Sequence, residues 1–189
     1  MRQHSASRWT CLALLLATGI THAAGRAQGF GVAFECDLEY GGDDIATVEF
    51  TDGSGQHVKT AQGVTAAIGG QYRASADSPF SVRGTVGYKY VTTAASNADI
   101  HIGRVVYELV GGYVWDSGWR LGAGITHHSN IKFDADGFGQ DVRFDDATGP
   151  TVELGWRWIA LSYTQLDYTD EYGGNWDASS FGLTLISKF

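Results

Sequence analysis

The stretch FGVAFECDLEY, residues 30–40, alternates apolar and polar side chains along its whole length. Its aromatic and aliphatic side chains occupy the even positions, whereas Glu35, Asp37 and Glu39 occupy odd ones. Successive side chains of a β-strand point to opposite faces, so a period of two predicts one long strand with an apolar face and a charged face.

The same alternation returns along the rest of the chain, in segments separated by clusters of Gly, Asp, Asn and Ser. The clearest segments are 80–90, 104–115, 119–126, 151–158 and 181–189. Weaker alternation covers 45–51, 58–72 and 161–168, with the least defined register between Gly53 and Ala76. Eight or nine strands result, and because closed bacterial barrels have even strand numbers we expect eight.

The charged face of the well-defined strands is almost balanced. It carries five carboxylates and six cations, namely Glu35, Asp37, Glu39, Glu108 and Glu153 against Arg83, Lys89, Arg104, Arg120, Arg157 and Lys188. The interior of an eight-stranded barrel is just wide enough for side chains to fill. If this face points inward, the charges form a self-paired plug, which disfavours an ion or solute channel.

Periodicity alone leaves open which face points inward. A soluble, lipocalin-like barrel would hold the apolar face inside, whereas a transmembrane barrel would turn it toward lipid. Strands of about ten residues with aromatic side chains near their ends are typical of transmembrane β-strands. The last residue, Phe189, closes an alternating strand, as is common in outer-membrane barrels.

The N-terminus favours the transmembrane alternative. Two arginines precede an apolar stretch, residues 11–20, and the small-residue site Thr21 to Ala23 follows. This order is that of a secretory signal peptide. We expect a cleaved signal over 1–23 and one domain over 24–189, an all-β, antiparallel up-and-down transmembrane β-barrel in the outer membrane of a Gram-negative bacterium.

Composition excludes several other classes. The chain of 189 residues carries a net charge of -8 and shows no Lys/Arg cluster, so a nucleic-acid footprint is missing. Cys36 is the single cysteine beyond the signal, so no internal disulfide is expected. No cofactor motif and no zinc-site pattern occur. The acidic loops at 134–146 and 167–177 could bind divalent cations weakly.

The segment Thr126-His127-His128-Ser129-Asn130 is the strongest candidate for chemistry. Here the chain resembles the lipid A 3-O-deacylases, small outer-membrane barrels with a His-x-Ser-Asn motif followed by an acidic residue. The resemblance implies that Ser129 attacks an ester, His127 takes its proton and Asn130 assists. Residues i and i+2 of a strand share a face, so the spacing suits that chemistry, and parity places both on the lipid side.

The acidic partner is open. Asp141 lies at the expected distance along the chain, whereas Glu153 follows an apparent insertion, and Asp145 and Asp146 between them are further candidates. Glu153 has inward parity and could reach His127 only if a bulge near Pro150 reversed the register. The alternative interpretation is that residues 127–130 are simply the polar end of a strand that enters an extracellular loop.

A broader resemblance covers most of the mature chain. It rests on residues 51–54, 87–90, 95–97, 119–124, 144–149 and 166–168. These segments are similar to a family of uncharacterised proteobacterial outer-membrane β-barrel proteins. That resemblance implies fold and location but no activity. Two functions therefore stand side by side: a non-enzymatic barrel with an envelope or surface role, in contact with outer-membrane lipid and lipopolysaccharide, and an esterase acting on lipid A.

Overall fold

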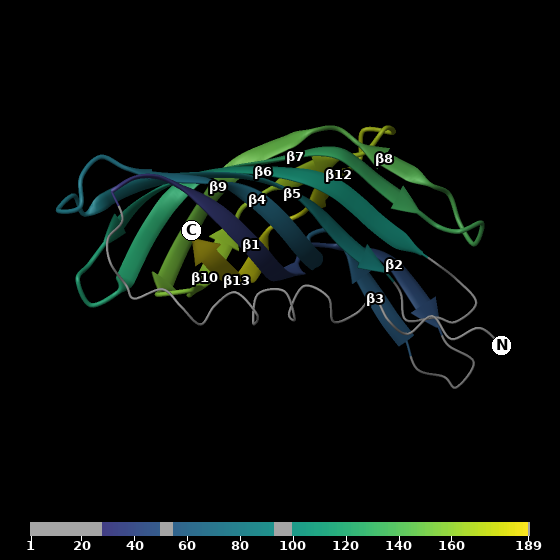
Figure 1. Cartoon of the computed structure of the whole chain (residues 1–189). Coiled ribbons are helices and arrows are strands. Elements are labelled where there is room, and N and C mark those ends of the chain that lie inside the picture. The colour runs from purple at the N-terminus through teal and green to yellow at the C-terminus, as the bar shows by residue number, and fades with distance from the viewer. Residues whose placement is uncertain (1–27, 50–54, 93–99, 189) are drawn as a thin grey trace.

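The computed structural model describes residues 28–49, 55–92 and 100–188 (Figure 1). The expected signal peptide lies outside these residues. No helix in the described ranges has the length and apolar character to cross a membrane.

Eight antiparallel strands form a closed barrel in which each strand pairs with its neighbours along the chain. They are β1 (Gly29–Gly41), β4 (Gly63–Arg73), β5 (Phe80–Thr92), β6 (His101–Val114), β7 (Trp119–Asp134), β9 (Ala147–Trp156), β10 (Ile159–Thr164) and β13 (Ser180–Lys188). Pairing of β1 with β13 joins the first strand to the last, and pairing of β6 with β7 completes the ring. The predicted eight-stranded up-and-down barrel is confirmed.

The remaining strands belong to the long loops. They are β2 (Asp44–Glu49) with β3 (Gly55–Lys59), β8 (Val142–Phe144) beside β7, and β11 (Asp167–Thr169) with β12 (Asn175–Asp177). All follow barrel strands that run the same way, so they gather at one end of the barrel (Figure 1). We call this the loop end and the opposite end, with its short connections, the turn end. In outer-membrane barrels the long loops are extracellular.

Three expected strands need correction. Residues 44–49 pair with β3 in a loop hairpin instead of joining the wall, and residues 50–51 lie outside the described part. The expected strand over 58–72 is divided between β3 and β4, and the one over 161–168 leaves the barrel after Thr164. Loop hairpins have the same period of two as wall strands, so alternation cannot separate them.

Arg157 also lies elsewhere than predicted. It occupies a tight turn with a φ of 54°, because β9 ends at Trp156 and β10 begins at Ile159. Its guanidinium lies over the Trp156 ring, 4.5 Å from the centroid, on the outside of the turn end. The expected interior position of Arg157 is wrong, and the side chain of Lys188 lies outside the described part.

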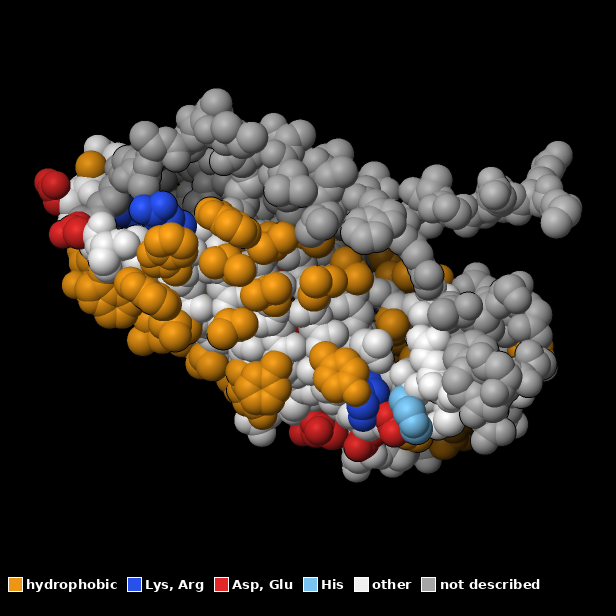
Figure 2. All heavy atoms as spheres, turned by 90° about the horizontal axis from the view of Figure 1, so that it is seen from below, with side chains coloured by type: hydrophobic (Ala, Val, Ile, Leu, Met, Phe, Trp, Pro, Cys, Tyr) orange, Lys and Arg blue, Asp and Glu red, His pale blue; other side chains and the backbone are white. Residues whose placement is uncertain are grey.

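The outer wall is apolar and the bore is charged. Figure 2 shows hydrophobic side chains along the wall, with charged groups toward its ends. Leu121 is 52% exposed and Ile125 53%, whereas Lys89 and Arg104 are fully buried. Large apolar side chains are normally buried in water-soluble proteins. This reversed polarity is that of an outer-membrane barrel, and it excludes the soluble alternative.

A β-bulge changes the parity of β7 near the loop end. The register between β6 and β7 shifts by one residue beside Gly103, and Asn130 has a φ of 52°. Asn tolerates this left-handed conformation better than most residues. Beyond the bulge, Ile131 and Phe133 are buried, although plain alternation from His127 would turn them outward.

The loop hairpins and the upper strand ends bury an apolar cluster, which we call the cap core. Its members are Val58, Ala61, Ile100, Ile102, Ile131, Phe133, Ala135, Phe144, Ala147, Leu166, Tyr168 and Ala178. The cap core lies at the loop end, so the described loops pack against one another and against the strands that they connect.

Candidate functional site

The bore is crossed by an ion-pair network centred on Arg83. Its Nε lies 2.5 Å from Glu35 Oε1 and its Nη2 lies 3.1 Å from Glu108 Oε1. Arg83 also donates two hydrogen bonds to the carboxylate of Glu153, at 3.1 and 2.7 Å. Arg120 Nε donates to the same carboxylate at 3.2 Å. Side chains from four strands besides β5 therefore meet in this network. Those of β1, β6 and β9 contact the Arg83 guanidinium, and that of β7 contacts Glu153.

A second charged layer lies nearer the loop end. The Lys89 ammonium pairs with Glu39, and Arg104 donates to the Gln62 carbonyl at 3.1 Å. Arg104 also lies over the ring of Tyr168, 5.9 Å from its centroid, which joins this layer to the cap core. The predicted self-paired plug is thus two charged layers deep.

The Glu153 side chain lies inside the bore. It points inward as its parity predicts, and Pro150 pairs in regular register with Ile125, so no bulge turns Glu153 toward His127. Asp141 is elsewhere too: its Oδ1 accepts a hydrogen bond from the Ala135 amide at 3.0 Å in the β7–β8 connection. Neither Glu153 nor Asp141 meets His127, because Glu153 faces the opposite side of the wall and Asp141 is held in a loop.

His127 lies on the outer wall as predicted. It contacts two residues at the start of the neighbouring strand β9. Its Nδ1 lies 2.8 Å from Thr148 Oγ1, and its Nε2 lies 3.8 Å from Asp146 Oδ2. Asp146 Oδ1 also accepts the Asn130 backbone amide at 3.3 Å. The His127 side chain is 40% exposed and that of Asp146 60%. Hydroxyl, imidazole and carboxylate thus follow one another across the surface.

Ser129 stands apart from this arrangement. It is the next outward residue of β7 before the bulge, yet within the described ranges no hydrogen bond joins its hydroxyl to His127. Thr148 occupies Nδ1 instead, because His127 is its register partner across β7 and β9. With Nε2–H toward Asp146, Nδ1 would be the acceptor for the Thr148 hydroxyl proton.

Thr148 is the residue that sequence reasoning missed at this site, whereas Asp146 is one of the four acids that it left open. The alternation of 147–156 marks Thr148 as outward, but only the register of β9 against β7 shows which residue faces it. Asp146 comes directly before that strand, and its contact with His127 depends on the turn into β9.

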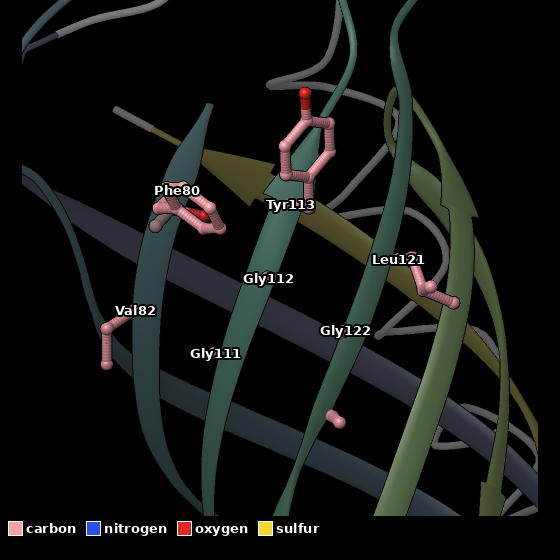
Figure 3. Close-up of a pocket in the computed structure, with 9 residues that line it drawn as sticks. Phe80, Val82, Gly111, Gly112, Tyr113, Leu121 and Gly122 are labelled. Atoms are coloured by element: carbon pink, nitrogen blue, oxygen red, sulfur yellow. The ribbon is translucent and has the colours of Figure 1, made fainter. Parts of the chain in front are cut away.

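An apolar groove runs in the outer wall over β5, β6 and β7, nearer the turn end. Figure 3 shows Phe80 and Val82 on one side and Leu121 on the other, with Gly111, Gly112 and Tyr113 on the strand between them. The Phe80 and Tyr113 rings meet edge to face, 5.4 Å between centroids. No charged side chain lines the groove in the described part of the chain, and its lining is mainly apolar.

No metal centre is evident in the described ranges, where no three His, Cys, Asp or Glu side chains are grouped to hold an ion. In the acidic loop at 134–146, Asp134 Oδ1 accepts the Asp136 amide at 2.8 Å. Weak binding of divalent cations by the acidic loops stays a prediction.

No known protein family and no curated protein matches the chain. The solved structures that resemble it include three outer-membrane proteins. The outer membrane protein AlkL is 18% identical with a TM-score of 0.49, over 89% of this chain and 94% of that one. Ail, the attachment invasion locus protein of Yersinia pestis, is 12% identical with a TM-score of 0.42, over 85% and 100%. Neisserial surface protein A is 15% identical with a TM-score of 0.41, over 84% and 97%.

Sequence identities and TM-scores this low say nothing of what this chain binds or does. The resemblance to lipid A 3-O-deacylases therefore stays a prediction. The class rests on the molecule itself. Closed strand pairing, an apolar exterior and a charged bore define a small eight-stranded outer-membrane β-barrel.

Proposed function

We propose that this protein is a non-conducting, non-enzymatic barrel that serves the envelope or cell surface through its loops and its lipid-facing wall. The observation that carries the proposal is the bidentate contact of Arg83 with Glu153 across the bore, reinforced by Glu35 and Arg120. A solute could pass only by displacing these side chains.

The energetics support a closed bore. Breaking a buried ion pair by removing one partner costs about 3–5 kcal/mol, because the other charge is left uncompensated. A passing ion would have to separate several such pairs in two layers. The cap core adds packed apolar side chains at the loop end of the same path.

Electrical recording from planar bilayers tests this proposal. We expect the folded wild-type protein to give no stable conductance steps. A variant with Glu35→Ala, Arg83→Ala and Glu153→Ala removes the three central charges of the Arg83 network and serves as the opened comparison. Stable steps from the wild-type protein, with folding confirmed by its heat-dependent shift on gels, would reject the non-conducting barrel.

One observation favours a second function, hydrolysis of a lipid ester. The Thr148, His127 and Asp146 side chains form a hydroxyl, imidazole and carboxylate series on the lipid-facing wall. In such a reaction a hydroxyl oxygen bonds to the ester carbonyl carbon, and His127 takes the hydroxyl proton. His127 then returns that proton to the departing alcohol. Water finally releases the acyl group as a carboxylic acid.

The nucleophile would be Ser129, as the motif implies, or Thr148, as the contacts favour. The Asn130 backbone amide already donates to Asp146, so only its side-chain amide could stabilise the developing oxyanion.

Mass spectrometry of lipid A from a Gram-negative host tests this second function. The host expresses wild-type protein, His127→Ala, Ser129→Ala or Thr148→Val, at equal levels of folded barrel. Loss of an ester-linked acyl chain that requires His127 would establish the hydrolase and overturn the non-enzymatic proposal. Dependence on Ser129 or on Thr148 would then identify the nucleophile. Unchanged lipid A with every protein would reject hydrolysis.

A further inference from the structure

Among the side chains that the structure describes, two cations differ from the others in having no partner. The buried cations Arg83, Lys89, Arg104 and Arg120 belong to the charged layers, and Arg73 is also buried and has a partner. On the surface Lys59 pairs with Asp44 at 2.7 Å. Arg157 lies on an indole ring. Within the described ranges, the side chains of Lys132 and Arg143 take part in no ion pair and no hydrogen bond.

These two cations stand directly opposite each other. Lys132 of β7 and Arg143 of β8 are register partners on adjacent antiparallel strands, and both are exposed. Their neighbours Phe133 and Phe144 are buried in the cap core, so the cations share the outward face. Such partners have Cβ atoms about 4.5–5.5 Å apart, and like charges there are destabilising.

The surroundings do not neutralise the pair. Glu171 is nearby, but its Oε1 accepts the backbone amide of Arg143 at 3.3 Å. A chain with a net charge of -8 thus places two adjacent unpaired cations on one outward surface. An anion that bridges ammonium and guanidinium would remove their repulsion, and phosphate matches the fork of donors on Arg.

The depth of the pair indicates where that anion comes from. Thirteen residues separate Lys132 from Trp119, which begins β7 at the turn end. At about 3.3 Å per residue and a tilt of about 40°, Lys132 lies about 30 Å above Trp119. The apolar band of such barrels is about 25 Å tall. The two cations therefore lie just beyond the hydrocarbon, at the level of lipid headgroups.

The wall below the pair suits the rest of a lipid. Descending β6 and β7, the outward register pairs are Tyr107 with His127, Leu109 with Ile125, and Gly111 with Ala123, where the apolar groove begins. The groove begins four residues above Trp119, about 10 Å up, which is about 15 Å below the outer edge of the apolar band. One leaflet of hydrocarbon is about 15 Å thick, so an outer-leaflet chain covers Leu109 and Ile125 and ends at the upper edge of the groove.

We propose that Lys132 and Arg143 bind the phosphate of an anionic outer-leaflet lipid, one of whose acyl chains lies along Leu109 and Ile125 as far as the upper edge of the groove. The site depends on the membrane placement of the barrel but not on the absence of a pore or on ester hydrolysis.

Native mass spectrometry tests the site. The protein is placed in phosphatidylcholine nanodiscs that contain a small fraction of diphosphoryl lipid A, and the lipid A retained after release is measured. Each Lys or Arg near a membrane surface contributes about 1 kcal/mol to binding of anionic lipid, so Lys132→Gln with Arg143→Gln should retain about 30-fold less. Dephosphorylated lipid A should be retained equally weakly by both proteins.

Matched variants control for charge and folding. Arg157→Gln removes a surface cation at the turn end and should leave retention unchanged, and Lys132→Arg should preserve it. Equal retention by wild type and the double variant, or an equal loss in Arg157→Gln, would overturn the proposal. It would also be overturned if inorganic phosphate bound the pair in pure phosphatidylcholine discs while lipid A was not retained.

Discussion

The bore and the cap core lie within the same barrel yet are built from opposite side chains. At membrane depth Arg83, Glu35 and Glu153 fill the interior, while Ile125 and Leu121 face outward. At the loop end the interior is apolar, and Lys132 and Arg143 face outward.

The difference follows from the solvent on the outside. The hydrophobic effect favours burial of apolar side chains only where the alternative is water. Lipid tails are as apolar as leucine, so at membrane depth apolar side chains gain little by turning inward. Where the wall rises above the hydrocarbon, water returns as the solvent and an ordinary apolar core forms.

The largest expected effect is in the bore. Glu153→Ala leaves the guanidinium groups of Arg83 and Arg120 buried without their shared carboxylate. We expect the free energy of unfolding to fall by about 3–5 kcal/mol. Urea unfolding in lipid vesicles, followed by tryptophan fluorescence, measures the change. Glu171→Ala removes an exposed loop carboxylate and is expected to shift the value by about 0.5 kcal/mol or less; similar losses would contradict the comparison.

The second effect concerns the lipid face. Ile125 lies midway up the apolar wall, and Ile125→Arg is expected to destabilise the barrel by about 2–4 kcal/mol. Trp119→Arg at the turn end is expected to change the free energy by only about 0–1 kcal/mol, since an arginine there reaches the interface. The same vesicle unfolding measurement reports both, and equal values would show that the wall is not graded by depth.

A smaller effect distinguishes apolar contacts within the cap core from apolar contacts with lipid. Ile131→Val removes one methyl group from the cap core and is expected to cost about 1 kcal/mol, because a packed site is left short of atoms. Ile125→Val makes the same change against lipid, which can fill the space, so its effect should be near zero. Hydrogen exchange of the β8 and β11 amides measures the first, and vesicle unfolding measures the second. A larger loss at Ile125 would reverse the comparison.

The smallest effect is a pH response at the loop end. Asp170 accepts hydrogen bonds from Trp176 Nε1 at 2.9 Å and from the Gly174 amide at 2.7 Å. These bonds, that of Trp176 first, hold the pKa of the Asp170 carboxyl below its ordinary value. The carboxylate therefore stabilises the β11–β12 hairpin above the ordinary aspartate pKa, and this support is lost as pH falls through the lowered value.

Acid titration followed by the Trp176 indole NH resonance tests this response. We expect a change only below the ordinary aspartate range, with the barrel amides unaffected. Asp170→Asn should remove the transition. A titration at the ordinary aspartate pKa would show that the hydrogen bonds do not favour the charged form.

Much of the fold was predictable because lipid on one side and charge on the other impose a strict period of two. Residues 30–40 illustrate this, since Glu35 and Glu39 point inward as their parity predicts. Arg157 shows the limit. Arg157 has the same odd-numbered parity as Glu153, which predicts an inward side chain, but the chain turns at Arg157. Because a two-residue turn does not interrupt the alternation of the flanking strands, the pattern does not reveal the turn.

The site was predictable only in part. The outward position of His127 follows from the alternation of its own strand, and the inward position of Glu153 follows in the same way. The contact with Thr148 depends on pairing between β7 and β9, which one strand's pattern does not contain. The contact with Asp146 depends further on the loop that leads into β9.

The bulge at Asn130 reverses the numbering parity of the two faces of β7. Below it, odd-numbered residues face outward, and above it even-numbered residues do, because the strand accommodates one extra residue there. Deleting Asn130 would restore plain alternation and leave Ile131 inward and Lys132 outward. Keeping Asn130 but pairing it as an ordinary strand residue would exchange the faces above it, sending Lys132 into the cap core and Ile131 to the surface. The bulge, as much as the composition of β7, therefore determines which side chains this wall presents above the membrane.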